Sequence, residues 1–323
     1  MFSSFDRIDH KVLAELDRNS RQSFSQIAKK LRLGSDLIAY RVERYRREEI
    51  IGRFSALVDP LACGWWIFKN YFKLETSSRR LGGFLRFLEK YPATYWLAEL
   101  NGRFDVVCNM CAGSPSDCEA FQNALHEHYG NIILEHEVCV VTSVTRLSRK
   151  YLLSREPHEY LLSRKGPPVL LNAEEVKLLN LLYDDARTSA VEIGESLNIS
   201  PAAVRYRIEQ LEERGVILAY RFQFNFTVVG LMLCKLLLQL ADQSEKFNDQ
   251  LNLYCREHPK VTDFIRQLGR FPVEIEIEVE DYAVLNQFIE DFRLKFDTGI
   301  RSCEVVLIKN DLYHRFPATA PGA

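Results

Sequence analysis

Hydrophobic residues near the start of the chain recur at the spacing of amphipathic helices. They form three short stripes, at residues 8–16, 24–31 and 38–45, in which apolar positions lie three or four residues apart. Leu33-Gly34-Ser35 interrupts the pattern between the second and third stripes. Three short helices with a tight turn between the last two predict a helix-turn-helix, and a strand-like segment at 50–58 leads out of it.

The pattern then alternates between strand-like and helix-like segments. Strands are predicted at residues 65–74, 94–100, 104–110 and 132–144, with helices at 81–91 and 118–129. Asn101-Gly102 indicates a hairpin turn between the two middle strands. The order βαββαβ predicts a ferredoxin-like domain, whose sheet has helices on one face and a second face free to pack on another sheet.

The second half of the chain repeats the first. Tyr40-Arg41-Val42-Glu43 returns as Tyr206-Arg207-Ile208-Glu209, a shift of 166 residues, and Gly102-Arg103-Phe104 returns as Gly269-Arg270-Phe271 after one insertion. Ser200-Pro201 adds a start signal for the third helix of the second copy, a capping hydroxyl followed by proline. We therefore predict the α+β class, with winged helix-turn-helix domains and ferredoxin-like βαββαβ sensor domains, the pair duplicated in tandem.

Domain boundaries follow from the repeat. The prediction is a first helix-turn-helix domain at 1–60, a first sensor domain at 61–152, a linker at 153–171, a second helix-turn-helix domain at 172–226, a second sensor domain at 227–316 and a disordered tail at 317–323. Pro157, Gly166, Pro167 and Pro168 break regular structure in the linker. Residues 160–164 echo residues 151–155, which favours an amphipathic linker helix.

The two copies of the repeat differ in the charge of their helix-turn-helix segments. The 323 residues carry a formal net charge of −2, so any contact with nucleic acid has to be local. Residues 1–53 hold 12 Lys and Arg against 8 Asp and Glu, whereas residues 172–221 hold 6 against 9. The chain shows no secretory signal and no apolar run long enough to cross a membrane, and its eight cysteines are too sparse for a disulfide scaffold. A soluble, cytoplasmic protein with no membrane partner is expected.

A helix-turn-helix places its last helix in the major groove of DNA. Phosphate contact needs positive charge, and Gln210 and Glu213 stand in the second copy where Arg44 and Arg47 stand in the first. We predict double-stranded DNA as the partner, bound more strongly by the first motif. The candidate DNA-binding residues are Tyr40, Arg41, Arg44, Arg46, Arg47, Arg205, Tyr206 and Arg207. The alternative is a small helical bundle whose charged face is only solvated.

A helix-turn-helix followed by a βαββαβ domain resembles the leucine-responsive/asparagine regulator (Lrp/AsnC, or feast/famine) family. The matching motifs are Asp6-x-x-Asp9-x-x-Val12-Leu13, Asn19-Ser20-Arg21, Arg41-Val42, Asp59-Pro60 to Gly64, and Gly102-Arg103-Phe104-Asp105 at the family's Gly-Asp-Tyr-Asp turn. The resemblance implies transcription control responsive to amino acids or related metabolites. It also implies self-association through the sensor sheets, which we expect to pack on each other within one chain.

The resemblance places the effector between sensor domains, near the turn. We predict an effector site at Gly102, Arg103 and Asp105, where glycine lets the backbone approach a ligand and the two charges suit a zwitterion. The alternative is that both charges belong to a solvated turn. Pro272 replaces the aspartate in the second copy, so one ligand per chain is expected.

Two further patterns are interpreted as structural. Cys108-x-x-Cys111 falls on a predicted strand, where residues three apart point to opposite faces, so both cysteines are interpreted as core. Glu274, Glu276 and Glu278 alternate along one strand with Glu280, which favours a solvated edge over a site for a cation or basic partner. No metal site, cofactor or catalytic residue is predicted.

An enzyme on the same architecture is the alternative function. Siroheme decarboxylases resemble this family and also work as paired units. Such an enzyme would need His and Arg side chains converging on a tetrapyrrole near the sensor turn, and the hairpin strands offer Tyr95, Trp96, Arg266 and Arg270 without a histidine. The regulator is therefore favoured, and the chain is not expected to be an enzyme.

Overall fold

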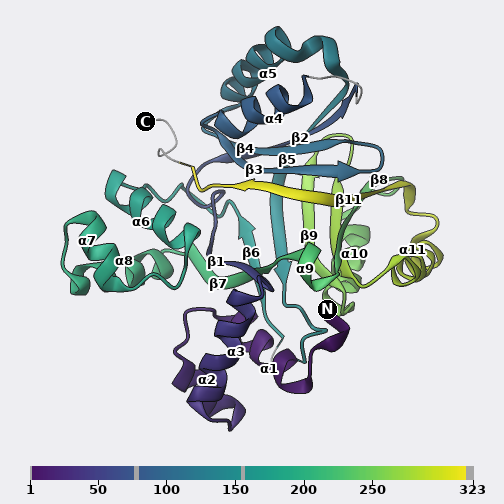
Figure 1. Cartoon of the computed structure of the whole chain (residues 1–323). Helices are drawn as coiled ribbons and strands as arrows, with labels where there is room; N and C mark the ends of the chain where they lie inside the picture. Colours follow the sequence, from purple (N-terminus) through teal and green to yellow (C-terminus); the bar gives the residue numbers. More distant parts are fainter. Residues whose placement is uncertain (1, 76–79, 154–156, 318–323) are drawn as a thin grey trace.

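Apart from short helical segments such as α9, each half of the chain folds into the same series of elements (Figure 1). The computed structural model describes residues 2–75, 80–153 and 157–317. The first unit contains α1 (Arg7–Arg18), α2 (Phe24–Leu31), α3 (Ser35–Arg47), β1 (Ile51–Val58), β2 (Trp66–Leu74), α4 (Leu81–Lys90), β3 (Thr94–Asn101), β4 (Val106–Ala112), α5 (Pro115–Tyr129) and β5 (Ile133–Leu147). The second contains α6 (Ala173–Asp184), α7 (Ala190–Leu197), α8 (Pro201–Glu213), β7 (Ile217–Phe224), α9 (Phe226–Val229), β8 (Met232–Leu240), α10 (Glu245–Glu257), β9 (Val261–Leu268), β10 (Val273–Val279), α11 (Tyr282–Phe296) and β11 (Ile300–His314). The predicted fold class is confirmed, and no helix in the described ranges is long and apolar enough to cross a membrane.

Matching capping residues give both helix-turn-helix motifs the same turn. In the first motif, the Ser23 side chain accepts a hydrogen bond from the Gln26 backbone N–H while the Gln26 side chain accepts from the Ser23 N–H. Ser189 and Glu192 make the same pair of bonds in the second motif. Each middle helix then ends on a residue in the left-handed conformation, which redirects the chain into α3 or α8.

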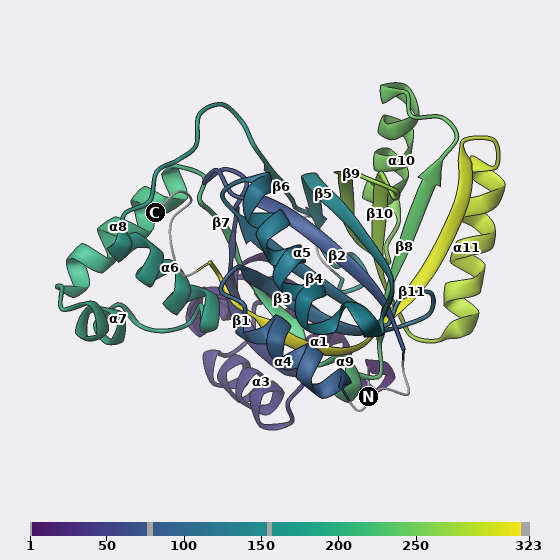
Figure 2. The same cartoon turned by 90° about the horizontal axis from the view of Figure 1, so that it is seen from above.

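The two sensor sheets join into one closed ring of strands. Within each unit the strand order is ferredoxin-like, β3-β4-β2-β5 and β9-β10-β8-β11. Between units, β3 pairs with β11 and β5 pairs with β9, both antiparallel. The sheets therefore pair within one chain, as predicted, but edge to edge, so that their inner faces enclose a barrel. Closure removes edge strands whose backbone groups would otherwise lack partners. Figure 2 shows α4 and α5 outside the first sheet and α10 and α11 outside the second.

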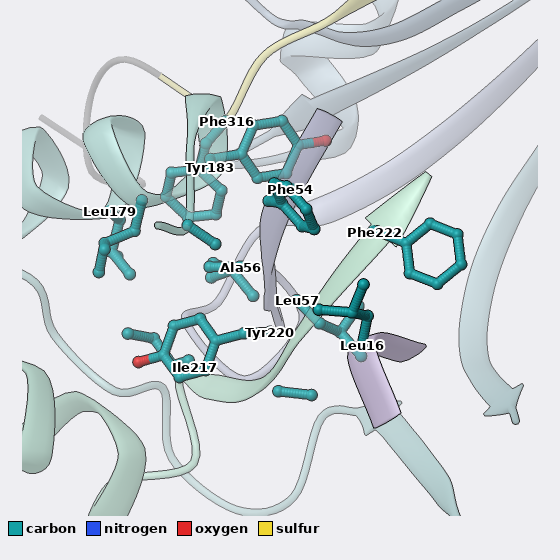
Figure 3. Packing of buried hydrophobic residues seen from close by; sticks show 14 of the residues in the cluster. Leu16, Phe54, Ala56, Leu57, Leu179, Tyr183, Ile217, Tyr220, Phe222 and Phe316 are labelled. Atoms are coloured by element: carbon teal, nitrogen blue, oxygen red, sulfur yellow. The ribbon is translucent and has the colours of Figure 1, made fainter. Parts of the chain in front are cut away.

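A two-stranded ribbon, β1 with β7, connects the helix-turn-helix motifs around a pseudo-twofold axis. Its register is symmetric, with Ile51 opposite Phe224 and Val58 opposite Ile217. Each motif leans on the other unit's strand, so that α1 packs on β7 and α6 on β1. The Ala186 N–H donates to the Phe54 carbonyl at 3.0 Å, in the core that Figure 3 shows around this ribbon. The two motifs are thus held to one scaffold.

The predicted linker helix is wrong, because β6 (Glu159–Ser163) occupies part of that segment. This strand pairs antiparallel with β5, from Ser143↔Ser163 to Leu147↔Glu159. The physical reason is that β2 pairs with β5 only as far as Val141. The remainder of that edge of β5 is therefore free to pair with β6. Residues 318–323 of the predicted disordered tail lie outside the described residues, whereas Phe316, just before the tail, is buried against Trp65.

Glycines at the two hairpin turns allow each turn to pack closely against the backbone of the other unit. Gly102 has φ +129°, and a Cβ there would lie 2.8 Å from the Val305 carbonyl oxygen of the other unit. Gly269 has φ +132°, and its Cβ would lie 2.8 Å from the Val138 carbonyl oxygen. We expect Gly102→Ala or Gly269→Ala to lower the free energy of unfolding by at least about 2 kcal/mol, from backbone strain plus the clash.

Urea denaturation checks this prediction, with Gly215→Ala as the matched control. Gly215 also has a positive φ of +69°, but a Cβ there meets no atom within 4 Å. Backbone strain alone should cost about 1 kcal/mol. Equal losses at Gly215 and at the two hairpin glycines would contradict the packing role.

Candidate functional site

The outer end of α3 presents a basic and aromatic surface. Tyr40 is 58% exposed, and the side chain of Arg47 is 62% exposed. Arg46 lies with its guanidinium 4.9 Å from the Phe54 ring centre and 3.6 Å from the Asp185 carboxylate. Arg47 also lies 3.5 Å from the Glu48 carboxylate, and all three of these predicted DNA-binding side chains lie at the surface.

Two other predicted DNA-binding residues are held by α1. Arg41 donates to Asp9 and to Asp6, both at 2.7 Å, and Arg44 donates to Asp9 at 2.6 Å. The Tyr45 hydroxyl also donates to the same Asp9 oxygen. Burial raises the pKa of Asp9, but these hydrogen bonds outweigh it and leave the pKa below its ordinary value. Asp9 thus locks α3 onto α1, and a role of Arg41 and Arg44 at DNA stays a prediction.

The second recognition helix, α8, presents the opposite charge at the corresponding end. Arg205 and Tyr206 are exposed, while Arg207 forms an ion pair with Glu174 at 2.5 Å. Glu212 and Glu213 are exposed where α3 carries Arg46 and Arg47. A phosphate backbone would be attracted by α3 and repelled by this end of α8.

The predicted effector residues at the first hairpin turn are bonded to protein groups. Arg103 donates to Glu304 of the other unit at 2.9 Å and to Glu135 at 2.7 Å. Asp105 accepts from Lys73 at 3.0 Å and from the Leu74 N–H at 2.8 Å. Gly102 packs against β11, as described above. An effector that binds both Arg103 and Asp105 would have to compete with three ion pairs.

The corresponding turn of the second unit repeats this arrangement. Arg270 pairs with Glu137 of the first unit at 2.6 Å, as Arg103 pairs with Glu304. Glu135 lies between the two arginines and pairs with Arg270 as well, at 3.1 Å. The charges at both turns therefore hold the units together across the pseudo-twofold axis.

A cavity of about 190 Å³ lies inside the barrel, beneath the β1–β7 ribbon. Paired positions on neighbouring strands bring His314, Trp96, Asn109 and Lys69 into one row along its wall. The corresponding row on the other side consists of Arg146 from β5 of the first unit and of Asp263, Glu276 and Lys235 from the second unit. Trp96 and Asn109 are uncharged, whereas the residues at the corresponding positions of the second copy, Asp263 and Glu276, are carboxylates.

Buried charges fill much of the barrel. Glu274 is fully buried and accepts from Lys69 at 2.8 Å, Lys235 at 2.7 Å and the Tyr71 hydroxyl at 2.5 Å. Burial raises the pKa of Glu274, and the two lysines outweigh this effect and lower it well below its ordinary value. The solvated-edge interpretation is therefore wrong for Glu274 and for Glu278, which is 2% exposed. The alternation did place them on one face, but that face lines the closed barrel.

One end of the barrel is closed by an ion-pair network. Asp17 accepts from Arg149 at 2.8 Å and from Arg221 at 2.6 Å, and Arg149 also donates to Glu278 at 2.8 Å. Burial raises the pKa of Asp17, but Arg221 and Arg149 outweigh burial and lower it to about 2. The carboxylate is therefore charged at neutral pH and joins α1 to β7 and to the end of β5.

Sequence reasoning missed Arg53, Asn109 and His314, which all line the cavity. They come from β1, β4 and β11, far apart in the chain, so no local motif contains them. Comparison of the copies would have given one signal, because Asn109 replaces Glu276 and Trp96 replaces Asp263. Cys108 and Cys111, by contrast, are buried as expected, and burial raises the pKa of both thiols.

Two solved structures are similar to nearly the whole chain. One is the siroheme decarboxylase NirDL, with a TM-score of 0.65, 12% identity, and coverage of 96% of this chain and 94% of that one. The same enzyme in complex with an iron-uroporphyrin III analogue gives a TM-score of 0.64. At this identity the likeness establishes the shared fold. The prediction that the chain is not an enzyme is contradicted, since the architecture that it shares over its full length is that of an enzyme.

The sequence comparisons identify the family. The winged helix-turn-helix DNA-binding family matches residues 5–51 and again 175–217. The transcriptional regulator LrpA of Pyrococcus horikoshii is 31% identical over 144 residues, which cover 43% of this chain and 98% of LrpA. LrpA of Pyrococcus abyssi is 34% identical over 136 residues, or 41% of this chain and 92% of that protein. The chain therefore belongs to the Lrp/AsnC family of transcriptional regulators, with two DNA-binding helix-turn-helix units in tandem.

Proposed function

We propose that the chain is a cytoplasmic, sequence-specific DNA-binding regulator that contacts its operator unequally through its two motifs. The observation that carries the proposal is the opposite charge at the exposed ends of the recognition helices, Arg46 and Arg47 on α3 against Glu212 and Glu213 on α8. A symmetric dimer reads a palindrome because its symmetry matches that of the DNA. A chain with diverged motifs lacks that symmetry.

Selection of binding sites from random double-stranded DNA tests this proposal. We expect a site with one strongly specified half, contacted by α3, and a second half that is weakly specified or absent. Tyr40, Arg46 and Arg47 are the side chains placed to contact it, and Arg205 and Tyr206 are the exposed candidates of the second motif. A palindromic consensus with two equally specified halves would contradict unequal binding.

Control by a small metabolite is part of the same proposal. The family resemblance supports it, and Gly102, Arg103 and Asp105 stay candidates for effector binding. Their ion pairs mean that a ligand there would compete with contacts that hold the two units together. Self-association of chains through the sensor sheets also stays a prediction. The edge strands β3, β5, β9 and β11 already pair within the chain, so a second chain would have to use other surfaces of the sheets.

A tetrapyrrole decarboxylase is the second candidate function. Two observations favour it: the full-length fold likeness to NirDL, and the presence of Arg53, Arg146 and His314 on one cavity. Arginine suits the carboxylates of such a substrate. The cavity of about 190 Å³ is, however, smaller than the ≈300–1,000 Å³ of pockets that hold drug-sized ligands, so the barrel would have to open.

Absorbance titration of the full chain with siroheme, followed by an assay for released carbon dioxide, tests the second candidate. A saturable change in the siroheme spectrum that is lost in His314→Ala, together with carbon dioxide release, would support it. A spectrum that stays the sum of free siroheme and protein would refute it. DNA binding is measured separately, so the two candidates are distinguished in one set of preparations.

A further inference from the structure

The two ends of the barrel cavity differ, although the repeat makes them equivalent. At the closed end, Asp17, Arg221 and Glu278 belong to the buried ion-pair network. Their repeat equivalents at the other end are Tyr183, Ser55 and Cys111, none of which is charged at neutral pH. Arg221 and Glu278 of the first set, and Tyr183 and Ser55 of the second, line the cavity. We call the end at Tyr183 and Ser55 the open end.

Arg53 stands at the open end and forms no ion pair with a carboxylate of the described residues, although its charge acts on Asp184, whose pKa burial raises and Arg53 lowers. Its Nε donates to the Gln223 side chain at 2.8 Å, and its guanidinium lies 4.7 Å from the Tyr183 ring centre. No carboxylate of the described residues lies within ion-pair distance of it. The repeat equivalent of Arg53 is Ala219, so the arginine is particular to this end. Arg53 is half-buried, and a half-buried cation without an ion-pair partner attracts an anion.

Arg146 and His314 line the same cavity as Arg53, and the Asp311 carboxylate pairs with His314 at 2.6 Å. Arg146 lines the cavity and is paired with Asp263 at 2.7 Å, and 36% of its side chain is accessible. Burial lowers the pKa of His314, and the charges of Arg53 and Arg146 lower it further, against the opposite effect of Asp311. All three side chains therefore line one cavity.

An unsatisfied amide lies on the same wall. Asn109 is 8% exposed, lines the cavity, and its Oδ1 has no hydrogen-bond partner among the described residues. Buried polar side chains normally have a partner, which is a protein group, a water molecule or a ligand. The rings of Trp96, Tyr95 and Tyr183 also line the cavity and offer apolar surface.

We propose that the open end of the barrel binds one small aromatic monocarboxylate of amino-acid size. Arg53 holds the carboxylate, the Trp96 ring and the packed pair Tyr95–Tyr183, whose ring centres are 6.1 Å apart, contact the aromatic body, and Asn109 Oδ1 accepts a hydrogen bond from a polar substituent. One unpaired cation matches one carboxylate, and about 190 Å³ holds a molecule of this size. The proposal rests on the proposed regulator function and assigns its effector to the barrel instead of the hairpin turn.

The position of the site links it to the DNA-binding motifs. Arg53 and Ser55 lie on β1, and Tyr183 lies on α6 of the second motif. β1 pairs along its length with β7, and this ribbon carries both motifs. A ligand held by these side chains would therefore stabilise one arrangement of the ribbon and of the two recognition helices. Differential binding to two arrangements is what an effector needs.

Isothermal titration calorimetry on the full chain tests the site directly, with L-phenylalanine, phenylpyruvate and benzoate as probes. We expect at least one probe to bind with one site per chain. Arg53→Ala should weaken this binding at least tenfold, and Arg53→Lys should weaken it less, because the charge remains. Ala219 shows that this ribbon position accepts alanine in the other copy, and thermal melting checks that the variant folds.

Arg293→Ala is the matched control, since it removes an exposed arginine of α11 and leaves the cavity lining intact. It should leave the affinity for the probe unchanged. Failure of all three probes to bind, binding that survives Arg53→Ala unchanged, or two equivalent sites per chain would overturn the proposal. DNA affinity without any probe reports on the proposed regulator function by itself, so the failure of one proposal is distinguishable from that of the other.

Discussion

Replacing Arg46 and Arg47 together by alanine is expected to weaken DNA binding roughly fiftyfold at 0.1 M salt and to flatten its salt dependence. Both side chains lie at the exposed end of α3 and can reach phosphates without breaking the buried bonds that hold Arg41 and Arg44. Each lost phosphate contact lowers the slope of log K against log salt by about 0.9. The double variant should therefore lose about 2 from that slope.

The matched control is Glu212→Ala with Glu213→Ala at the corresponding end of α8. This pair should leave DNA affinity unchanged or raise it slightly, because it removes repulsion from phosphate. Fluorescence anisotropy with a selected DNA site, repeated at several salt concentrations, measures both variants. Equal losses from the two pairs, or an unchanged salt slope in the arginine variant, would refute the unequal roles of the motifs.

Asp17→Ala is expected to lower the free energy of unfolding by about 3–5 kcal/mol. The substitution leaves Arg221 buried without a carboxylate partner and removes one of the two partners of Arg149. An uncompensated buried charge is more destabilising than the loss of an exposed ion pair. Asp249→Ala, at an exposed position of α10, is the control and should change stability by less than about 0.5 kcal/mol.

The same carboxylate predicts a dependence of stability on pH. The folded-state pKa of Asp17 is about 2, below the ordinary value of 3.8. Its contribution of about 2 kcal/mol is therefore fully present above pH about 4 and is lost as the pH falls towards 2. Urea denaturation at a series of pH values should show this loss in the parent protein and a smaller one in Asp17→Ala. Parallel pH profiles of the two proteins would contradict the assignment.

The sequence by itself determined the elements and their order. Helical stripes, the Asn101-Gly102 turn and the Ser200-Pro201 start signal are local features, and each acts through its own few residues. The repeat then predicted two equivalent units, and both sheets have the expected strand order. The linker strand escaped this reasoning because β6 forms only where β5 offers a free edge.

Only the tertiary structure decided what most of the charged residues do. Alternation predicted that Glu274 and Glu278 share a face, but the closure of the barrel decided that this face meets Lys69 and Arg149 instead of water. Likewise, Arg41 was correctly placed on the recognition helix, and its pairing with Asp9 followed from the packing of α1.

The cavity site follows the same division. Arg53, Asn109 and His314 come together because β3 pairs with β11 and because β1 crosses the barrel with β7. Such pairings join residues about 200 positions apart, as Trp96 opposite His314 illustrates. Local periodicity predicts the face of a strand on which a residue lies. The residues that it contacts there depend on non-local strand pairing, which periodicity does not predict.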